Sequence, residues 1–139
     1  MSTQIFVFGS NLAGRHGAGS ALEARRNHGA IYGRGVGRQG WSYAIPTKDF
    51  ELKTLPLEQI KMYVDEFLEY AEAHPELTFY VVRIGCGLAC YTDAQISPLF
   101  KDASVNCDLP HRWTRVRGYR SFGTSTSCTL SRLGITGLT

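Results

Sequence analysis

The chain has 139 residues, of which 43% are hydrophobic and 19% charged, and it carries a net charge of +3. This composition excludes wholesale disorder, a collagen-like chain and a coiled coil, and the length suits one domain with a single core. The sequence shows no basic and apolar leader and no run of about 18 apolar residues. We therefore expect a cytoplasmic protein that does not engage a membrane.

Glycine and charge are unevenly distributed along the chain. Nine of the 15 glycines and five arginines fall in the first 40 residues, where Glu23 is the one acid. Residues 51–76 hold seven acids, whereas the residues after Asp108 hold five arginines and no acid. An anionic partner is therefore favoured at the glycine-rich front and at the tail. So many glycines indicate a backbone that turns sharply or lets another group approach closely.

The four cysteines give no pattern typical of a zinc site. Cys86 and Cys90 have a CxxxC spacing, but Cys107 and Cys128 form no second close pair, and the four histidines are scattered. A zinc site needs such a second pair. We expect reduced thiols, no metal and no cofactor.

The first half of the chain predicts two strands and one helix. An apolar run that ends at Gly9 is typical of a buried strand, and Gly29 is placed to end the helix that follows. In chain order we expect a strand at Gln4–Phe8, a loop at Ser10–Ala18, a helix at about Gly17–Asn27, a glycine-rich loop or irregular hairpin at 29–40, and a strand at Trp41–Pro46.

The second half predicts two helices and two strands. Ile60, Val64 and Phe67 recur at helical spacing, and Thr92 and Gln95 have the spacing of a capping box. Pro98 should kink or split the second of these helices. In chain order we expect a helix at Pro56–Ala73, a strand at Thr78–Ile84, a tight loop at Gly85–Ala89, a helix at Thr92–Asp102 and a short strand at Val105–Leu109.

Strands that alternate with helices predict an α/β domain in three layers, with helices flanking a sheet. Two of the strands end in glycine loops. Because ligands of open α/β sheets bind beyond the carboxyl ends of the strands, we expect both loops to face one pocket. The domain should span residues 1–113. Residues 114–139 form a basic extension rich in Ser, Thr and Gly, either a weakly packed arm or an added edge strand or hairpin.

The loop from Gly9 to Gly19 lies between a strand and a helix. Backbone amides of such a turn, with a helix N-terminus behind them, can bind an anion. The Asn11 amide can donate and accept hydrogen bonds, and Arg15 and His16 could add charge. The alternative is a plain turn whose glycines allow tight packing.

Neither common nucleotide motif fits the glycines. Residues 17–22 have Leu22 where a dinucleotide fingerprint needs its third glycine or alanine. Residues 35–40 match GxGxxG but precede a strand instead of opening a helix. No Gly-Lys-Ser/Thr sequence is present. The glycines at 33–40 therefore indicate no more than a shaped surface loop.

The second loop, Gly85–Ala89, could offer backbone donors to a second phosphate. A nucleophilic thiol at Cys86 is an alternative, although no histidine lies near it in the sequence. Phe8, Trp41 and Tyr91 could stack on a base, but core packing is the favoured interpretation.

Four segments resemble the macrodomain family, most of all small macro-like proteins of phages and bacteria. They are Val7–Gly14, Gly17–Gly19, Tyr43–Lys48 and Ile84–Leu88. The resemblance covers about residues 4–113. It implies a three-layer α/β/α fold with a mixed central sheet and a cleft for ADP-ribose or a related nucleotide-derived ligand.

The resemblance also assigns residues to that cleft. It implies that Asn11 faces the ribose, that Gly17–Gly19 form the first phosphate loop and that Gly85–Leu88 form the second. The expected ligand-binding residues are Phe8, Gly9, Asn11, Gly17, Ala18, Gly19, Gly85, Cys86, Gly87 and Leu88.

One departure from the family separates binding from catalysis. In the branch that removes ADP-ribose from acidic residues, the sequence Gly-Cys-Gly-Leu is usually followed by an aspartate, and a lysine serves as nucleophile. Here residues 85–88 have that sequence, but Ala89 stands at the place of the aspartate. We therefore expect binding of a nucleotide-derived small molecule, with a hydrolase acting on an ADP-ribose conjugate or phosphate ester as the alternative. Asn11 and Lys48 would then catalyse hydrolysis, with His16 and Asp93 as the other polar candidates.

A second alternative is a protein that binds single-stranded nucleic acid through its basic C-terminal arm. Basic residues interleaved with aromatic residues suit single strands. The residues concerned are Arg112, Trp113, Arg115, Arg117, Tyr119 and Arg120.

Overall fold

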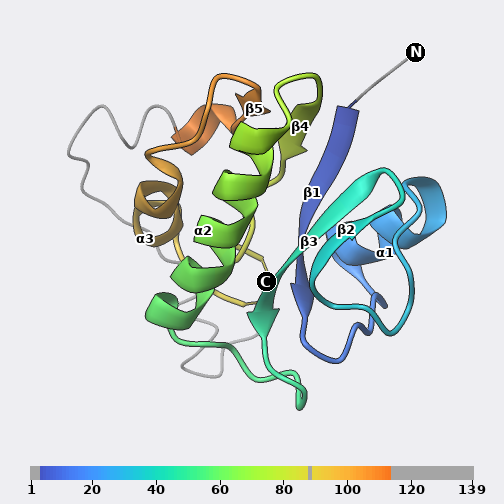
Figure 1. Cartoon of the computed structure of the whole chain (residues 1–139). Helices are drawn as coiled ribbons and strands as arrows, with labels where there is room; N and C mark the ends of the chain where they lie inside the picture. The colour runs from blue at the N-terminus through green and yellow to red at the C-terminus, as the bar shows by residue number, and fades with distance from the viewer. Residues whose placement is uncertain (1–3, 88, 114–139) are drawn as a thin grey trace.

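The computed structural model describes residues 4–87 and 89–113. Within them, four helices surround a five-stranded mixed sheet (Figure 1). The elements are β1 (Gln4–Asn11), α1 (Gly19–Asn27), β2 (Gly37–Gln39), β3 (Ser42–Lys48), α2 (Leu57–Ala73), β4 (Thr78–Val81), α3 (Asp93–Ile96), the 3-10 helix η1 (Ser97–Phe100) and β5 (Cys107–Asp108).

The strand order in the sheet is β2-β3-β1-β4-β5. Strands β3, β1, β4 and β5 are parallel, and β2 pairs antiparallel with β3 at one edge. Val7 at the middle of β1 lies between Tyr43 of β3 and Val81 of β4. The carboxyl ends of these three strands therefore open at the same edge. The expected α/β class is confirmed, and the sheet is mixed; the macrodomain-like layering stays a prediction.

Strand β1 is buried on both faces, which explains its continuous apolar run. Ile5 and Val7 belong to a cluster with α2, α3 and η1, whereas Phe6 and Phe8 pack with Ala21 and Ala24 of α1. Helix α1 thus covers one face of the sheet, and α2 covers the other.

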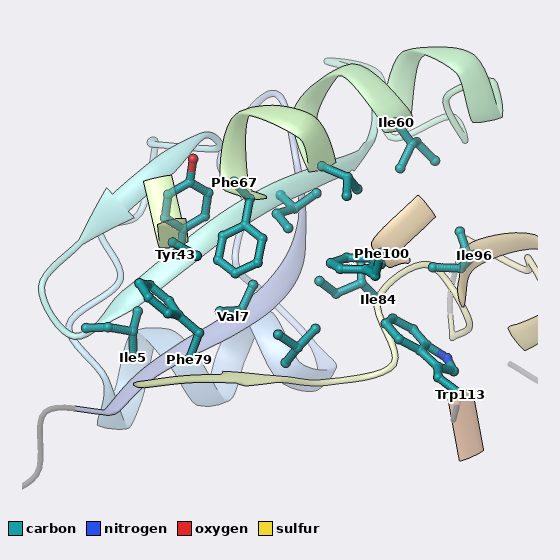
Figure 2. Close-up of a cluster of buried hydrophobic side chains, with 14 of the residues drawn as sticks. Ile5, Val7, Tyr43, Ile60, Phe67, Phe79, Ile84, Ile96, Phe100 and Trp113 are labelled. Atoms are coloured by element: carbon teal, nitrogen blue, oxygen red, sulfur yellow. The ribbon is translucent and has the colours of Figure 1, made fainter. Parts of the chain in front are cut away.

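The larger cluster lies between the sheet and α2. Figure 2 shows Phe67 of α2 beside Tyr43 and Phe79, with ring centroids 5.0 Å and 5.4 Å away. At the other end of the cluster Trp113 is fully buried, with its ring centroid 4.9 Å from that of Phe100. The core therefore extends to the last described residue.

Several element boundaries differ from the predicted ones. Strand β1 continues past Phe8 because Ser10 pairs with Pro46 of β3, and the expected loop starts correspondingly later. Strand β4 is shorter than predicted, ending at Val81, and β5 has two residues. The expected helix at Thr92–Asp102 is split, with Pro98 inside η1.

Three local predictions are confirmed. Thr92 and Gln95 form a reciprocal capping box at the start of α3. Gly29 follows the last residues of α1 with φ of 83°, as a helix-ending glycine should. The segment 29–40 contains β2 and pairs with β3 as an irregular hairpin.

Tyr43 should make the protein sensitive to alkaline pH. Burial, with Glu66 and Tyr70 nearby, raises the pKa of Tyr43 to about 12 from 10.0. The unfolded chain releases this proton at lower pH than the folded chain does. The contribution of Tyr43 to the free energy of unfolding is therefore fully present below pH 10. It falls by about 2–3 kcal/mol as the pH rises toward 12. Urea unfolding of wild type and Tyr43→Phe from pH 8 to 12 measures it; parallel curves would contradict the prediction.

Candidate functional site

A cleft of about 610 Å³ opens at the carboxyl ends of β1, β3 and β4. Its volume is within the range of small-molecule pockets, about 300–1,000 Å³. The described residues that line it are Gly9, Asn11, Arg15, Gly17, Ala18, Gly19, Ser20, Ala21, Tyr32, Thr47, Lys48, Leu52, Arg83, Ile84, Gly85, Gly87 and Ala89.

The first wall of the cleft is the loop between β1 and α1, and Asn11 holds its shape. The Asn11 Nδ2 group donates to the backbone oxygen of Arg15 at 3.0 Å. The backbone N–H of Arg15 donates back to Asn11 Oδ1 at 2.9 Å. Among the described residues, no further hydrogen bond uses the second N–H or the second oxygen lone pair of this amide, so both can serve a ligand. The predicted ligand-facing asparagine therefore also has a structural role.

The N-terminus of α1 completes this wall. Leu22 N–H makes the first intrahelical bond, to Ala18 O at 3.2 Å. The amides of Gly19, Ser20 and Ala21 precede that bond, and Ala18 provides no side-chain acceptor to cap them. The first turn of α1 also contains no acidic residue. These amides and the helix dipole favour negative charge in the cleft.

The glycines at 33–40, which suggested only a surface loop, support this wall from behind. A Cβ on Gly35 would lie 2.0 Å from the backbone oxygen of Asn11, and a Cβ on Gly14 would lie 2.2 Å from the backbone of Gly33. Gly33 N–H also donates to Gly14 O at 2.8 Å. The two glycine-rich segments thus pack backbone against backbone, which side chains there would prevent.

Gly17 and Gly87, on opposite walls, are different. A Cβ at either position would meet no atom of the described residues within 4 Å beyond its chain neighbours, and neither residue has a positive φ. Neither the backbone conformation nor the packing of the described residues therefore requires glycine at these two positions. Both open onto the cleft.

The second wall contains Arg83, which Asp93 holds in position. Arg83 Nε and Nη2 donate to the two oxygens of Asp93, each at 2.9 Å. The same carboxylate accepts from the buried indole of Trp113 at 2.8 Å, and Cys86 Sγ lies 3.5 Å away. Arg112 adds an ion pair at 3.6 Å. The network connects the second glycine loop to the core at Trp113.

Asp93 is ionised in this network. Burial raises its pKa, but hydrogen bonds from Arg83 and Trp113 outweigh that effect, so the pKa of Asp93 lies below its ordinary value of 3.8. The side chain of Asp93 is 13% exposed. Its charge therefore serves to orient Arg83 and does not enter the cleft.

The structure brings together most of the residues that the sequence predicted for the site. Lys48, which the sequence alone could not place, lines the cleft from the end of β3. So does Ala89, at the position where the resemblance has an aspartate. The predicted residues that line the cleft are Gly9, Asn11, Gly17, Ala18, Gly19, Lys48, Gly85 and Gly87.

Other predicted residues lie outside the cleft. Phe8 is fully buried in the α1-side cluster, because alternation along β1 directs its side chain to the face of the sheet that α1 covers. His16 is also fully buried; its Nε2 lies 3.0 Å from the backbone oxygen of Arg34, and its Nδ1 has no hydrogen-bond partner in the described structure. Cys86 and Asp93 contact each other behind the cleft. Leu88 is outside the described residues.

Sequence reasoning missed several lining residues. Thr47 belongs to the motif segment Tyr43–Lys48 but was not predicted as a site residue, and Arg83 directly precedes the segment Ile84–Leu88. Their position next to strand ends could have indicated them. Tyr32 and Leu52 come from loops far along the chain and left no local signal. Tyr32 is 55% exposed, with the guanidinium of Arg25 5.1 Å from its ring centroid.

The described residues offer no support for a metal site or a membrane span, and comparisons with known proteins identify no relative. No disulfide joins Cys86, Cys90 and Cys107 to one another. Within residues 4–87 and 89–113, no three His, Cys, Asp or Glu side chains gather as metal ligands would. No helix in that part of the chain is both long and apolar enough to span a bilayer. Comparison with protein-family models, curated proteins and solved structures found no match. The resemblance to macrodomains therefore stays a prediction.

Proposed function

We propose that the cleft binds ADP-ribose or a related nucleotide-derived anion within a macrodomain-like three-layer fold. The observation that carries the proposal is the pair Gly17 and Gly87. Within the described residues, neither the backbone conformation nor the packing requires glycine at these positions, yet both line the cleft, one from each glycine loop. Glycine at such positions lets a ligand approach the backbone closely.

The electrostatics of the cleft support an anionic ligand. Arg15, Lys48 and Arg83 line it together with the first turn of α1, and no Asp or Glu is among the described lining residues. A diphosphate between the two glycine loops would meet positive charge and backbone amides on both sides.

Hydrolysis of a conjugate has weaker support. The described lining residues include no carboxylate, imidazole or thiol that could activate water. Ala89 is 4% exposed, and Asp93 is engaged by Arg83 and Trp113. Lys48 and Asn11 both line the cleft, so substitutions of these two residues are the best test for hydrolytic turnover. An assay on ADP-ribosylated protein should show no release; release that disappears in Asn11→Ala/Lys48→Ala would establish the hydrolase instead.

One of the two aromatic residues predicted to stack on nucleic-acid bases from the C-terminal arm is buried in the core. Trp113 is fully buried and donates its indole N–H to Asp93, so it cannot stack on a base. Arg112 pairs with the same carboxylate. The other residues proposed for the arm, Arg115, Arg117, Tyr119 and Arg120, lie outside the described residues.

Calorimetric titration with ADP-ribose tests the proposal. Gly17→Ala and Gly87→Ala should each weaken binding by about tenfold, because the added methyl group occupies ligand space. The melting temperatures should stay unchanged, since the methyl group meets no atom within 4 Å in the part of the chain that the structure describes, its chain neighbours aside.

Ala94→Val is the matched control, because it adds carbon atoms at an exposed position outside the cleft. It should leave affinity unchanged. Absence of both heat and a melting shift at millimolar ADP-ribose would contradict the proposed function.

A further inference from the structure

The charge of the fold is divided between two segments of the chain. Residues 1–40 carry five arginines and one glutamate, a net charge of +4. Residues 41–113 carry six basic and eleven acidic residues, a net charge of −5. Helix α1 belongs to the first group and α2 to the second, and they cover opposite faces of the sheet (Figure 1). The split by face is not complete, because Arg38 Nη1 donates to the Tyr70 hydroxyl of α2 at 2.8 Å. A polyanion would still be attracted more strongly to the α1 side than to the acidic α2 side.

Three exposed residues on the α1 side form a surface that is continuous with the cleft. We name Arg15, Arg25 and Tyr32 the basic patch. Arg15 and Tyr32 both line the cleft. Their chain neighbours Gly14 and Gly33 are hydrogen-bonded, so the two side chains leave adjacent points of the backbone. The Arg25 guanidinium lies over the Tyr32 ring, 5.1 Å from its centroid, and extends the patch away from the cleft.

We infer that the basic patch binds the strand of a single-stranded nucleic acid, one end or modified nucleotide of which occupies the cleft. The inference rests on the proposed function. An exposed aromatic ring can stack on a base, and neighbouring arginines can contact the backbone phosphates. The expected class of substrate is therefore a nucleic-acid strand that carries the nucleotide-derived group.

An acidic protein segment suits the patch less well. Acidic side chains would use the charges of Arg15 and Arg25 but would leave the Tyr32 ring, which is 55% exposed, without a flat partner. A nucleotide strand uses both the charges and the ring, because its phosphates can contact the arginines and a base can stack on Tyr32. Base–aromatic stacking tolerates any sequence, so we expect binding with little sequence preference.

Fluorescence anisotropy with a short labelled single-stranded oligonucleotide, as DNA and as RNA, tests the inference. Wild type should bind it in a salt-dependent manner. An oligonucleotide with ADP-ribose attached at one end should bind about tenfold or more tightly than the plain strand or free ADP-ribose. Tyr32→Ala should weaken plain-strand binding by about fivefold or more. Arg25→Ala should lower the slope of log K against log salt by about 0.7.

Two variants serve as matched controls. Trp41→Ala removes another exposed ring that has an arginine over it, with Arg38 at 5.4 Å. Trp41 precedes β3, whereas the cleft lies at the end of that strand, about 20 Å away. Lys61→Ala changes net charge as Arg25→Ala does, but on α2. Both controls should bind the strand within about twofold of wild type.

Failure of the inference can be distinguished from failure of the proposed function. Arg25 does not line the cleft, so Arg25→Ala should bind free ADP-ribose as wild type does. Normal ADP-ribose binding with no salt-dependent strand binding would overturn the inference alone. Strand binding without ADP-ribose binding would overturn both the proposed function and the link between patch and cleft. Equal losses in Trp41→Ala and Tyr32→Ala, or equal competition by polyglutamate, would also overturn the inference.

Discussion

Gly14→Ala should lower the free energy of unfolding by about 2–5 kcal/mol. The residue has φ of +72°, a conformation that costs an L-residue about 1–2 kcal/mol. Its new Cβ would lie 2.2 Å from Gly33 C and 2.4 Å from Arg34 N, both backbone atoms that cannot move independently. Relief of such overpacking costs about a further 1–3 kcal/mol. Urea unfolding with a common m-value measures the loss.

Gly17→Ala is the control from the same loop. Its methyl group would meet no atom of residues 4–87 and 89–113 within 4 Å, apart from its chain neighbours, and its φ is not positive, so stability should change by no more than about 0.5 kcal/mol. The two variants should therefore separate folding from binding: Gly14→Ala destabilises the protein, whereas Gly17→Ala leaves it stable and weakens ADP-ribose binding. Equal stability losses in both variants would contradict this division.

The division among these glycines could not be predicted from the sequence. Gly14 and Gly17 stand close together in one loop, Gly19 follows at the start of α1, and their local sequence patterns are alike. What distinguishes Gly14 is Gly33, nineteen positions later, whose backbone it touches. The requirement for glycine thus arises from a contact between distant segments, and composition alone indicates only that close approaches occur somewhere.

The main elements were predictable because their signals are local. The apolar run of β1 reflects burial on both faces of the sheet. The helical spacing of Ile60, Val64 and Phe67 reflects burial of the one face of α2 that packs on the sheet. The capping box at Thr92 also needs only neighbours in the chain. The extension of β1 to Asn11 was not predictable, since Ser10 and Asn11 are polar and are held by pairing with β3.

The site was predictable where loops follow strands directly, and less so elsewhere. Gly9, Gly85 and Gly87 come to one cleft because β1 and β4 are parallel neighbours. Cys86 lies between two lining glycines, yet it contacts Asp93 behind the cleft. Tyr32 reaches the cleft through packing of one glycine-rich segment on another, which no short motif records.

Asp93→Ala should destabilise the protein by about 2–4 kcal/mol. The substitution would leave the indole N–H of Trp113, which is fully buried, without its acceptor. An unpaired buried donor costs about 1–3 kcal/mol, and loss of the bidentate pair with Arg83 adds to this. Because Arg83 would lose its orientation in the cleft wall, ADP-ribose affinity should fall as well.

Asp93→Asn isolates the charge in this network. The amide oxygen can still accept from Trp113, so the loss at neutral pH should be smaller, about 1–2 kcal/mol. The control is Asp65→Asn on α2, whose exposed pair with Lys61 at 2.8 Å should be worth no more than about 0.5 kcal/mol. Urea unfolding of the variants beside wild type gives these differences; equal losses at positions 65 and 93 would show that Asp93 has no special role.

The pH dependence of the same comparison tests the ionised state of Asp93. Its folded pKa lies below the ordinary 3.8, so its contribution is present above that value and is lost as pH falls through the folded pKa. The stability difference between wild type and Asp93→Asn should therefore be constant near neutral pH and should shrink below about pH 4. A difference that persists unchanged in acid would assign the effect of Asp93 to shape and hydrogen bonding, not to the charge that orients Arg83.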